Sequence, residues 1–335
     1  MFTPQVPLGS GFTAFSTVED VVGGVDLTSK IAMVTGGYSG LGRETVRVFL
    51  AAGAHVFVLA RDVARARTAL GEVSGAEILP LDLANQASIE DFSDQFLGLD
   101  LPLHILVNSS GIMAQPELAR DARGHELQFT TNHLGHCQLT LRLWPALVKA
   151  QGARVVWDSS KAHRFSPVVF EDVHFKRRPY DPWVGYGQSK TANILFALRL
   201  DDLGGEDGIR AFALHPGGII ETGLARHLPV GALQTMGVQG TDGRRIIDPA
   251  RDLKTIPHGA ATQAWCATSQ QLDGLGGVCC ENSDIVLLRQ DEPKSESPVD
   301  NSPTDVGVLL PHALDRAAAA KLWAVSDHLL GIRAT

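Results

Sequence analysis

The sequence predicts an α/β fold: one domain built on a doubly wound sheet of seven parallel strands. Three observations support this prediction. The chain has 335 residues, of which 44% are hydrophobic, so it can bury a large core. From Lys30 onward, short apolar runs alternate with amphipathic stretches of helical period. A glycine-rich turn follows the first apolar run, where a sheet of this kind binds ligands.

Seven short apolar runs form the predicted sheet. Most are apolar on both faces, which is typical of strands buried between two layers of helices. In chain order they are Ile31–Thr35, His55–Ala60, Glu77–Asp82, Ile105–Asn108, Arg154–Asp158, Arg210–His215 and Gly277–Cys280. Helical patterns between them are predicted at residues 41–52, 62–71, 85–97, 123–150, 186–203 and 258–268. The elements follow one another too closely for a second core, so we expect a single domain over residues 30–285.

An extension precedes this domain. Residues 1–29 are rich in proline and glycine. Ser16 to Glu19 has the pattern of a capping box, which predicts a short helix that runs to Gly23 and packs across the outer face of the sheet.

A loop and a helix are predicted after the domain, over residues 286–335. Asp291–Asp305 is polar and contains proline and serine, so we expect a mobile loop there. An alanine-rich helix is predicted to start at Pro311 and to end near Gly331.

Composition excludes several classes of function. Acidic residues outnumber basic ones by 37 to 29, so a broad basic surface for nucleic acid or anionic lipid is not expected. No apolar leader precedes Lys30, and no apolar run reaches the roughly 18 residues of a membrane span. The cysteines lack the spacing of metal ligands, so we expect no metal and free thiols in a reducing cytoplasm. They are Cys137, Cys266, Cys279 and Cys280.

The glycine-rich turn joins the first predicted strand to the first predicted helix. It reads TGGYSGLG over residues 35–42. Glycine lets the backbone turn sharply and approach a pyrophosphate, and the start of the helix presents free N–H groups to the anion. A position between strand and helix is the context of a Rossmann-type dinucleotide site; the alternative is a loop without a ligand.

Tyr186 and Lys190 lie one turn apart on the same face of a predicted helix, in the segment YGQSK. The pKa of a free tyrosine is about 10, and a neighbouring ammonium lowers it by stabilising the phenolate. Tyr186 could then be the general acid of carbonyl reduction and the general base of alcohol oxidation. An isolated pair of this spacing is more often a surface pair, so the interpretation depends on the other motifs.

Two further polar positions stand out. Ser159 and Ser160 follow the fifth predicted strand at the carboxyl edge of the sheet, although such a pair can also cap a helix. Asn132 lies inside a predicted helix, where asparagine is unfavourable; such exceptions are expected at functional sites, and the alternative is a hydrogen bond between helices.

These motifs, in this order, resemble the short-chain dehydrogenase/reductase family. The turn has the spacing TGxxxGxG, and HPGG follows the sixth predicted strand. NHLGHCQLT and YGQSKTAN are most similar to the retinol-dehydrogenase-like and WW-domain-oxidoreductase-like branch. The resemblance covers about residues 30–285. It implies an NAD(P)(H)-dependent oxidoreductase that acts on CH–OH and C=O groups, and a homodimer or homotetramer formed through the long fourth and fifth helices.

The resemblance implies roles for four catalytic residues. Ser160, rather than Ser159, would donate a hydrogen bond to the substrate oxygen. Tyr186 would exchange the proton, and Lys190 would also hold the nicotinamide ribose. Asn132 would hold a water that links the lysine to solvent.

The resemblance also implies the cofactor site. The turn would contact the pyrophosphate through Gly36, Tyr38, Ser39, Gly40, Leu41 and Gly42. Ala60 stands where members that prefer NAD carry an acidic residue, and Arg61 follows it. The resemblance therefore favours NADP(H), because Arg61 can accept a 2′-phosphate, while Asp62 leaves NAD(H) open.

Three later segments match cofactor positions of the family. Asp82 and Leu83 would contact adenine, although Asp82 could merely cap the next helix. Asn108 and Gly111 belong to NSSG, which stands where NNAG is usual.

The third segment follows the sixth predicted strand. Pro216 and Gly217 would close over the nicotinamide. Glu221 occupies the usual position of a threonine that binds the carboxamide, so a bulge is needed if Thr222 is to take that role.

Substrate hints come from two segments. The predicted flap at 161–185 contains five aromatic residues, which suggests a bulky apolar or aromatic alcohol or ketone; the alternative is that the rings only pack the flap against the domain. They are Phe165, Phe170, Phe175, Tyr180 and Trp183. A predicted lid at 223–257 would form the opposite wall. Alternative functions are a non-catalytic NADP(H) sensor and a double-bond reductase.

Overall fold

An eight-stranded, mostly parallel sheet forms the centre of the computed structural model, which describes residues 2–71, 73, 75–219, 221–289, 307 and 309–332. The strand order is β3-β2-β1-β4-β5-β6-β7-β8. The strands are β1 (Ile31–Thr35), β2 (His55–Ala60), β3 (Glu77–Pro80), β4 (Ile105–Asn108), β5 (Ala153–Asp158), β6 (Ile209–His215), β7 (Val278–Glu281) and β8 (Asp284–Ile285). The predicted doubly wound α/β fold is confirmed.

The number of strands differs from the predicted seven. β8 pairs antiparallel with β7, whereas the other neighbouring pairs in the sheet are parallel. Asn282 and Ser283 make the connecting turn, with φ angles of 56° each. Both central residues of this tight hairpin therefore have positive φ, and the pair Asn-Ser lacks the glycine that usually signals such a turn.

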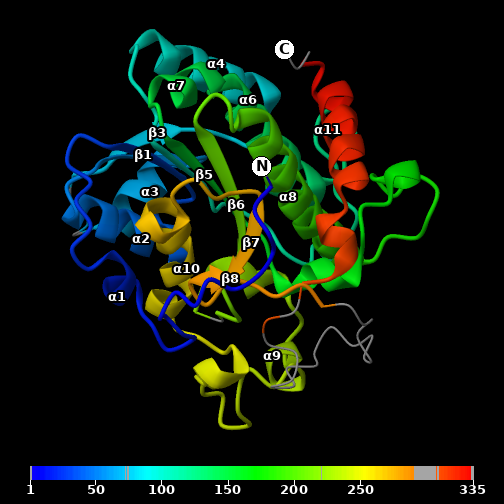
Figure 1. Cartoon of the computed structure of the whole chain (residues 1–335). Helices are drawn as coiled ribbons and strands as arrows, with labels where there is room; N and C mark the ends of the chain where they lie inside the picture. The colour runs from blue at the N-terminus through cyan, green and yellow to red at the C-terminus, as the bar shows by residue number, and fades with distance from the viewer. Residues whose placement is uncertain are drawn as a thin grey trace.

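Helices cover both faces of the sheet (Figure 1). They are α1 (Val18–Val22), α2 (Gly40–Ala51), α3 (Val63–Leu70), α4 (Gln86–Gly98), α5 (Leu127–Phe129), α6 (Gly135–Arg142), α7 (Trp144–Lys149), α8 (Pro182–Gly204), α9 (Ala232–Thr235), α10 (Ile256–Thr268) and α11 (Arg316–Leu330). One buried apolar cluster joins the sheet to α1, α2 and α10, and the other joins the opposite face to α4, α6, α7, α8 and α11.

The helix predicted at 123–150 is broken into several pieces. It begins only at α5, where the Glu126 side chain caps the first turn. Residues Thr130–Leu134 then form a π-helical turn before α6. Leu143 separates α6 from α7, and Pro145 lies in the first turn of α7, where a missing N–H costs nothing.

Other boundaries move for local reasons. β3 ends at Pro80 rather than Asp82, because the Asp82 side chain accepts a hydrogen bond from the Ala84 N–H in the following turn. α8 begins four residues before the predicted start, because Asp181 caps it and Pro182 fits the first turn.

The end segments also differ in detail. The capping box of α1 pairs Thr17 with Asp20 instead of Ser16 with Glu19, and α1 packs on α10 and α2. The last helix begins at Arg316, after a 3₁₀ turn that starts at Pro311. The loop predicted at Asp291–Asp305 lies outside the described residues. In the described part of the chain, no helix combines the length and apolarity that crossing a bilayer requires.

Candidate active site

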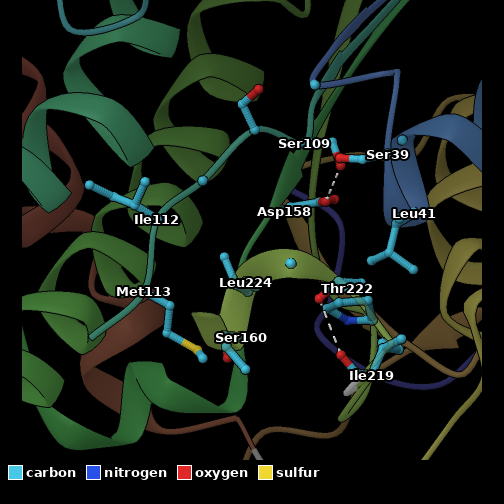
Figure 2. A pocket seen from close by; sticks show the side chains of 18 of the residues that line it. Ser39, Leu41, Ser109, Ile112, Met113, Asp158, Ser160, Ile219, Thr222 and Leu224 are labelled. Atoms are coloured by element: carbon cyan, nitrogen blue, oxygen red, sulfur yellow. Dashed lines mark hydrogen bonds between the residues drawn. The ribbon is translucent and has the colours of Figure 1, made fainter. Parts of the chain in front are cut away.

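A cavity of about 730 Å³ opens at the carboxyl ends of β1, β2, β4, β5 and β6. The glycine-rich turn borders one end of the cavity, and Ser160, Tyr186 and Lys190 line it farther along. Figure 2 shows Ser39 and Leu41 from the turn around the same space as Asp158 and Ser160 from the end of β5. The topology therefore joins the two predicted halves of the site in one cavity.

The turn after β1 has the backbone that a close approach requires. Gly36 has φ 66°, and a Cβ there would lie 2.6 Å from the Ser110 Oγ. A Cβ on Gly42 would lie 2.8 Å from the Gly36 carbonyl oxygen, so the start of α2 packs directly on the turn. Ser39 begins α2 without a side-chain cap, which leaves the N-terminal N–H groups available to an anion. The other predicted residues of the turn that line the cavity are Tyr38, Gly40 and Leu41.

Two guanidinium groups border the cavity beside β2. They belong to Arg61 and Arg65, and neither has an acidic partner among the described residues. The Asp62 carboxylate does not line the cavity: it accepts a hydrogen bond from the Arg65 N–H and caps α3. Asp82 and Leu83 also line this end, and Asp82 both faces the cavity and holds its own turn.

The segment after β4 divides between support and lining. The Asn108 side chain is buried below the cavity, where its Nδ2 donates to the Thr140 Oγ1 at 3.4 Å. Ser109, Ser110 and Gly111 line the cavity instead. The predicted contact of Asn108 with a cofactor is therefore not visible in this geometry, whereas Gly111 lies where expected.

The two serines after β5 face different surroundings. The Ser159 hydroxyl is buried and donates to the Lys190 carbonyl oxygen at 2.8 Å. The Ser160 hydroxyl is half-buried and accepts the Ala162 N–H at 3.2 Å, and its interaction with the Tyr186 phenol acts to lower the pKa of that phenol. Both serines border the cavity with Tyr186, but the Ser159 hydroxyl is engaged by the Lys190 backbone and joins the end of β5 to α8.

Tyr186 and Lys190 meet as their spacing predicts, but their electrostatics differ from the prediction. The Lys190 Nζ lies 5.5 Å from the centre of the Tyr186 ring and donates to the Asp158 carbonyl oxygen at 2.9 Å. Burial raises the pKa of Tyr186 above its ordinary value; the bond to Ser160 opposes this rise, and the Asp158 charge adds to it. Burial lowers the pKa of Lys190 to about 8, against the attraction of Asp158. The expected lowering of the tyrosine pKa is thus absent here, because burial is the largest influence on it.

Asn132 lies in the π-helical turn between α5 and α6. Its Oδ1 accepts the Ile112 N–H at 2.9 Å, and its Nδ2 donates to the Ile112 carbonyl oxygen and to the Ser189 Oγ, each at 2.9 Å. Asn132 therefore fastens the segment after β4 to α8, one residue from Gly111 and one from Lys190. π-Turns are rare and are often found at functional sites.

The segment after β6 separates Glu221 from Thr222. The Glu221 carboxylate accepts bonds from Arg245 at 3.0 Å and from the Ile256 N–H at 3.1 Å, so it caps α10 outside the cavity. Thr222 lines the cavity together with Pro216 and Gly217. Figure 2 shows Thr222 next to Ile219, whose carbonyl oxygen accepts its hydroxyl at 3.3 Å.

A buried ionic network lies behind this segment. The Asp252 Oδ2 is 2.7 Å from the Lys161 Nζ and 2.9 Å from the His215 Nε2, and the Oδ1 is 3.4 Å from the Lys254 Nζ. Burial acts to raise the pKa of Asp252, but these three partners hold it far below its usual range. His215, Asp252 and Glu281 have the spacing of metal ligands, yet two ammonium groups already contact Asp252 and would repel a cation.

Some aromatic residues of the flap line the cavity, and the others pack against the rest of the domain. Phe165 and Trp183 line the cavity, with their ring centres 5.9 Å apart. Phe175 and Tyr180 pack edge to face on each other, and the Tyr180 hydroxyl donates to the Gln115 carbonyl oxygen. The ammonium of Lys321 in α11 lies over the Phe170 ring. Opposite the flap, the lid contributes Leu228, Leu233, Met236 and Val238.

Comparison with known proteins identifies the family. A family model described as short chain dehydrogenase matches residues 30–230. The chain belongs to the short-chain dehydrogenase family. It is 41% identical over 308 residues to a Streptomyces antibioticus protein named "Probable oxidoreductase", covering 89% of this chain and 97% of that protein. It is 33% identical over 315 residues to human retinol dehydrogenase 12, covering 92% of this chain and 89% of the relative.

A solved structure has a similar fold. A crystal structure of an uncharacterised Mycobacterium paratuberculosis protein matches with a TM-score of 0.68 and 29% identity, covering 94% of this chain and 97% of that one. The predicted branch of the short-chain dehydrogenases is confirmed by the relatives, and the chain is an oxidoreductase of a family that uses NAD(P)(H).

Reasoning from the sequence did not assign Arg65, Asp158 and Ser109 to the site, although all three line the cavity of this short-chain dehydrogenase. Arg65 lies in the first turn of α3, and a helical register counted from Arg61 could have placed it beside that residue. Asp158 and Ser109 end neighbouring strands, and the Ser109 Oγ donates to the Asp158 Oδ2 at 2.7 Å. A carboxyl group that ends an otherwise apolar strand was the available signal.

Proposed function

We propose that the chain is an NAD(P)(H)-dependent alcohol dehydrogenase or carbonyl reductase that acts on a bulky apolar or aromatic alcohol or ketone. One observation carries this proposal: Ser160, Tyr186 and Lys190 line the same cavity as the glycine-rich turn. The nicotinamide cofactor, when bound, supplies or accepts the hydride. The chain's own residues then have to place the substrate oxygen and move one proton.

The described residues fit a dinucleotide. The open start of α2 and the close-packed glycines suit a pyrophosphate. Arg61 and Arg65, with Asp62 engaged as a helix cap, favour a 2′-phosphate, so NADP(H) is the preferred cofactor and NAD(H) the weaker one. Asp82 and Leu83 take the adenine end, and Gly111, Pro216, Gly217 and Thr222 the other half of the cofactor. Asn108 supports this surface from below.

Tyr186 is the proton donor of carbonyl reduction. Burial keeps its phenol protonated at neutral pH, and Ser160 lies within hydrogen-bonding reach of it. A carbonyl oxygen held by both hydroxyls takes the proton from Tyr186 as negative charge develops, and Ser160 stabilises that charge. In alcohol oxidation the same phenol oxygen accepts the proton.

Lys190 acts on the charge of the tyrosine, and Asn132 positions the segments on either side of the lysine. The Lys190 ammonium lies 5.5 Å from the centre of the Tyr186 ring, so its charge stabilises the phenolate left after transfer. Asn132 fixes the backbone beside the lysine through Ile112 and Ser189.

The substrate class follows from the far walls of the cavity. Phe165 and Trp183 of the flap line the same cavity as apolar side chains of the lid, such as Leu228 and Met236. Transfer of a bulky apolar group from water to such walls is favourable, whereas a charged group would lose its hydration.

The assembly is a homodimer or homotetramer in the cytoplasm. The four cysteines are free and buried, as suits a reducing compartment. α11 packs along α8, so an interface on this side has to include α11 together with the long helices.

Turnover with purified protein tests the proposal. Absorbance of reduced nicotinamide would be followed with aromatic and aliphatic ketones, with NADPH and NADH, for wild type and Tyr186→Phe. We expect consumption with NADPH and a loss of about 10²- to 10⁴-fold in kcat/KM for the variant, which lacks the proton donor. Binding of cofactor without turnover of any ketone would favour a sensor, and a product that keeps its carbonyl group would identify a double-bond reductase.

A further inference from the structure

Asp158 places a carboxyl group on the floor of the cavity. It is the last residue of β5, and its neighbour Trp157 packs into the cluster on the opposite face of the sheet. Asp158 is 6% exposed as a residue, and its Oδ2 accepts the Ser109 hydroxyl at 2.7 Å. Its Oδ1 is buried without a hydrogen-bond partner among the described residues. Figure 2 shows the Asp158 and Ser109 pair facing the same space as Ser160 and Thr222.

The proposed mechanism leaves this carboxyl group unused. The Lys190 ammonium donates to the Asp158 backbone carbonyl oxygen rather than to the carboxylate. The titratable and charged groups that face the carboxyl group are Lys190 and Tyr186, both from α8. Among the described residues, the Asp158 Oδ1 thus has no hydrogen-bond partner and the carboxyl group has no salt bridge, and a buried oxygen of this kind calls for an explanation.

The charge of this carboxyl group can change in the neutral range. Burial raises the pKa of Asp158 to about 6, although the Ser109 hydroxyl and the Lys190 charge favour the ionised form. A positive charge brought close to the carboxyl group would favour ionisation further.

We propose that Asp158 is an ionisable part of the nicotinamide subsite, and that its carboxylate makes the cavity bind oxidised cofactor more tightly, relative to reduced cofactor, as pH rises. This inference rests on the proposed function. Oxidised nicotinamide carries a positive charge on its ring and reduced nicotinamide does not, so a buried carboxylate separates the two by Coulomb attraction. The rest of the two molecules is the same, and the titration of their phosphates cancels in the ratio of their affinities.

The direction of the pH dependence follows from linkage. The ionised form of Asp158 is favoured when oxidised cofactor is bound, so binding lowers the Asp158 pKa and releases a proton near pH 6. The dissociation constant of oxidised cofactor divided by that of reduced cofactor therefore falls as pH rises from 5.5 to 7.5. A drop of about one unit in the Asp158 pKa upon binding, from about 6 to about 5, corresponds to a fall of about threefold over this range and about tenfold over the full titration.

The experiment measures binding rather than turnover. Dissociation constants for NADP⁺ and NADPH would be determined by calorimetry or by quenching of tryptophan fluorescence between pH 5.5 and 7.5. We expect about a threefold fall in their ratio for wild type and a constant ratio for Asp158→Asn. Ser109→Ala should keep the fall but move it to higher pH, because it removes a hydrogen bond to the carboxylate. Asp62→Asn removes an acidic group at the other end of the cavity and keeps a capping side chain, so it should behave as wild type.

Each other outcome overturns a stated claim. If wild type binds both forms of the cofactor and the ratio of their dissociation constants does not change with pH, the inference is refuted and the proposed function is unaffected. A fall that persists in Asp158→Asn, or that Ser109→Ala does not move, would assign the titration to another group. If wild type binds neither form, the proposed function and the inference both fail. If Asp158→Asn does not fold, as circular dichroism would show, the shift in Ser109→Ala decides.

Discussion

At the scale of single residues, the hydroxyl groups of the neighbouring Ser159 and Ser160 have different hydrogen-bond partners and different exposure. The buried Ser159 hydroxyl donates a hydrogen bond to the backbone carbonyl oxygen of Lys190. Ser160 keeps its hydroxyl at the cavity, next to Tyr186. A buried hydrogen bond between neutral groups contributes about 1 kcal/mol to the free energy of unfolding. A hydrogen-bond donor that points at the negative charge formed in the transition state increases the reaction rate instead.

Exchange of each serine for alanine should separate these two contributions. Ser160→Ala is expected to lower kcat by about 10²- to 10³-fold with little change in unfolding free energy, because it removes a donor to the substrate oxygen. Ser159→Ala should lower the unfolding free energy by about 1 kcal/mol and reduce kcat far less. Steady-state kinetics and urea unfolding of both variants provide the measurement. Equal losses of kcat would contradict the assignment of Ser160.

At the scale of elements, a buried carboxyl group caps α5, the short helix that leads into the π-turn. Glu126 is fully buried and accepts the N–H groups of Gln128 and Phe129 at 2.9 and 2.6 Å. Burial raises the pKa of Glu126 to about 7, although both backbone bonds oppose the rise. The folded protein therefore binds this proton more tightly than the unfolded chain, in which the pKa is about 4.3.

Stability should therefore fall as pH rises through this window. Between about pH 4.3 and 7 the native state holds a proton that the unfolded state has lost, and deprotonation costs up to about 3 kcal/mol. Glu126→Gln keeps an acceptor and removes the titration, so its unfolding free energy should change less with pH than that of wild type. Urea unfolding at a series of pH values measures the difference. Parallel curves for the two proteins would show that Glu126 does not titrate in this range.

The same elements show how far sequence reasoning reaches. β1, β2 and β4 were predicted with their observed ends, because apolar runs bounded by glycine or polar residues leave little choice of register. The break of the helix at 123–150 was not predicted, since the π-turn depends on the bonds that Asn132 makes to Ile112 and Ser189, which are distant in sequence. Motif spacing found the residues of the glycine turn and α8. Motif spacing did not predict a role for Asp158, because its contact with Ser109 joins the ends of two neighbouring strands that are distant in sequence.

At the scale of the whole molecule, the C-terminal helix is fastened to the centre of the chain. Trp323 of α11 stacks on Phe196 of α8, with ring centres 4.8 Å apart. Ser326 is hydrogen-bonded to His133 at 3.0 Å, and the Leu330 carbonyl oxygen accepts the Gln86 side chain at 3.3 Å. α11 thus contacts α8, the π-turn and α4, so the last helix supports the layer that carries Tyr186 and Lys190.

Removal of the stacked indole should loosen this layer. Trp323→Ala is expected to lower the unfolding free energy by about 3 kcal/mol, because it leaves a cavity between α11 and α8. Lys321→Ala, on the exposed side of α11, should cost less than about 0.5 kcal/mol. Chemical unfolding and amide hydrogen exchange of α11 measure both effects. Similar values for the two variants would mean that α11 is held by contacts other than the stack.

The network around Asp252 has a consequence for how the cavity can open. The Asp252 carboxylate forms ion pairs with Lys161, which follows Ser160, and with His215, which precedes Pro216. Asp252 itself lies near the C-terminal end of the lid. Removal of one partner from such a buried ion pair costs about 3–5 kcal/mol. The lid is therefore fixed at its C-terminal end to the segments that carry Ser160 and Pro216, and any opening motion of the lid has to come from the residues that precede Asp252.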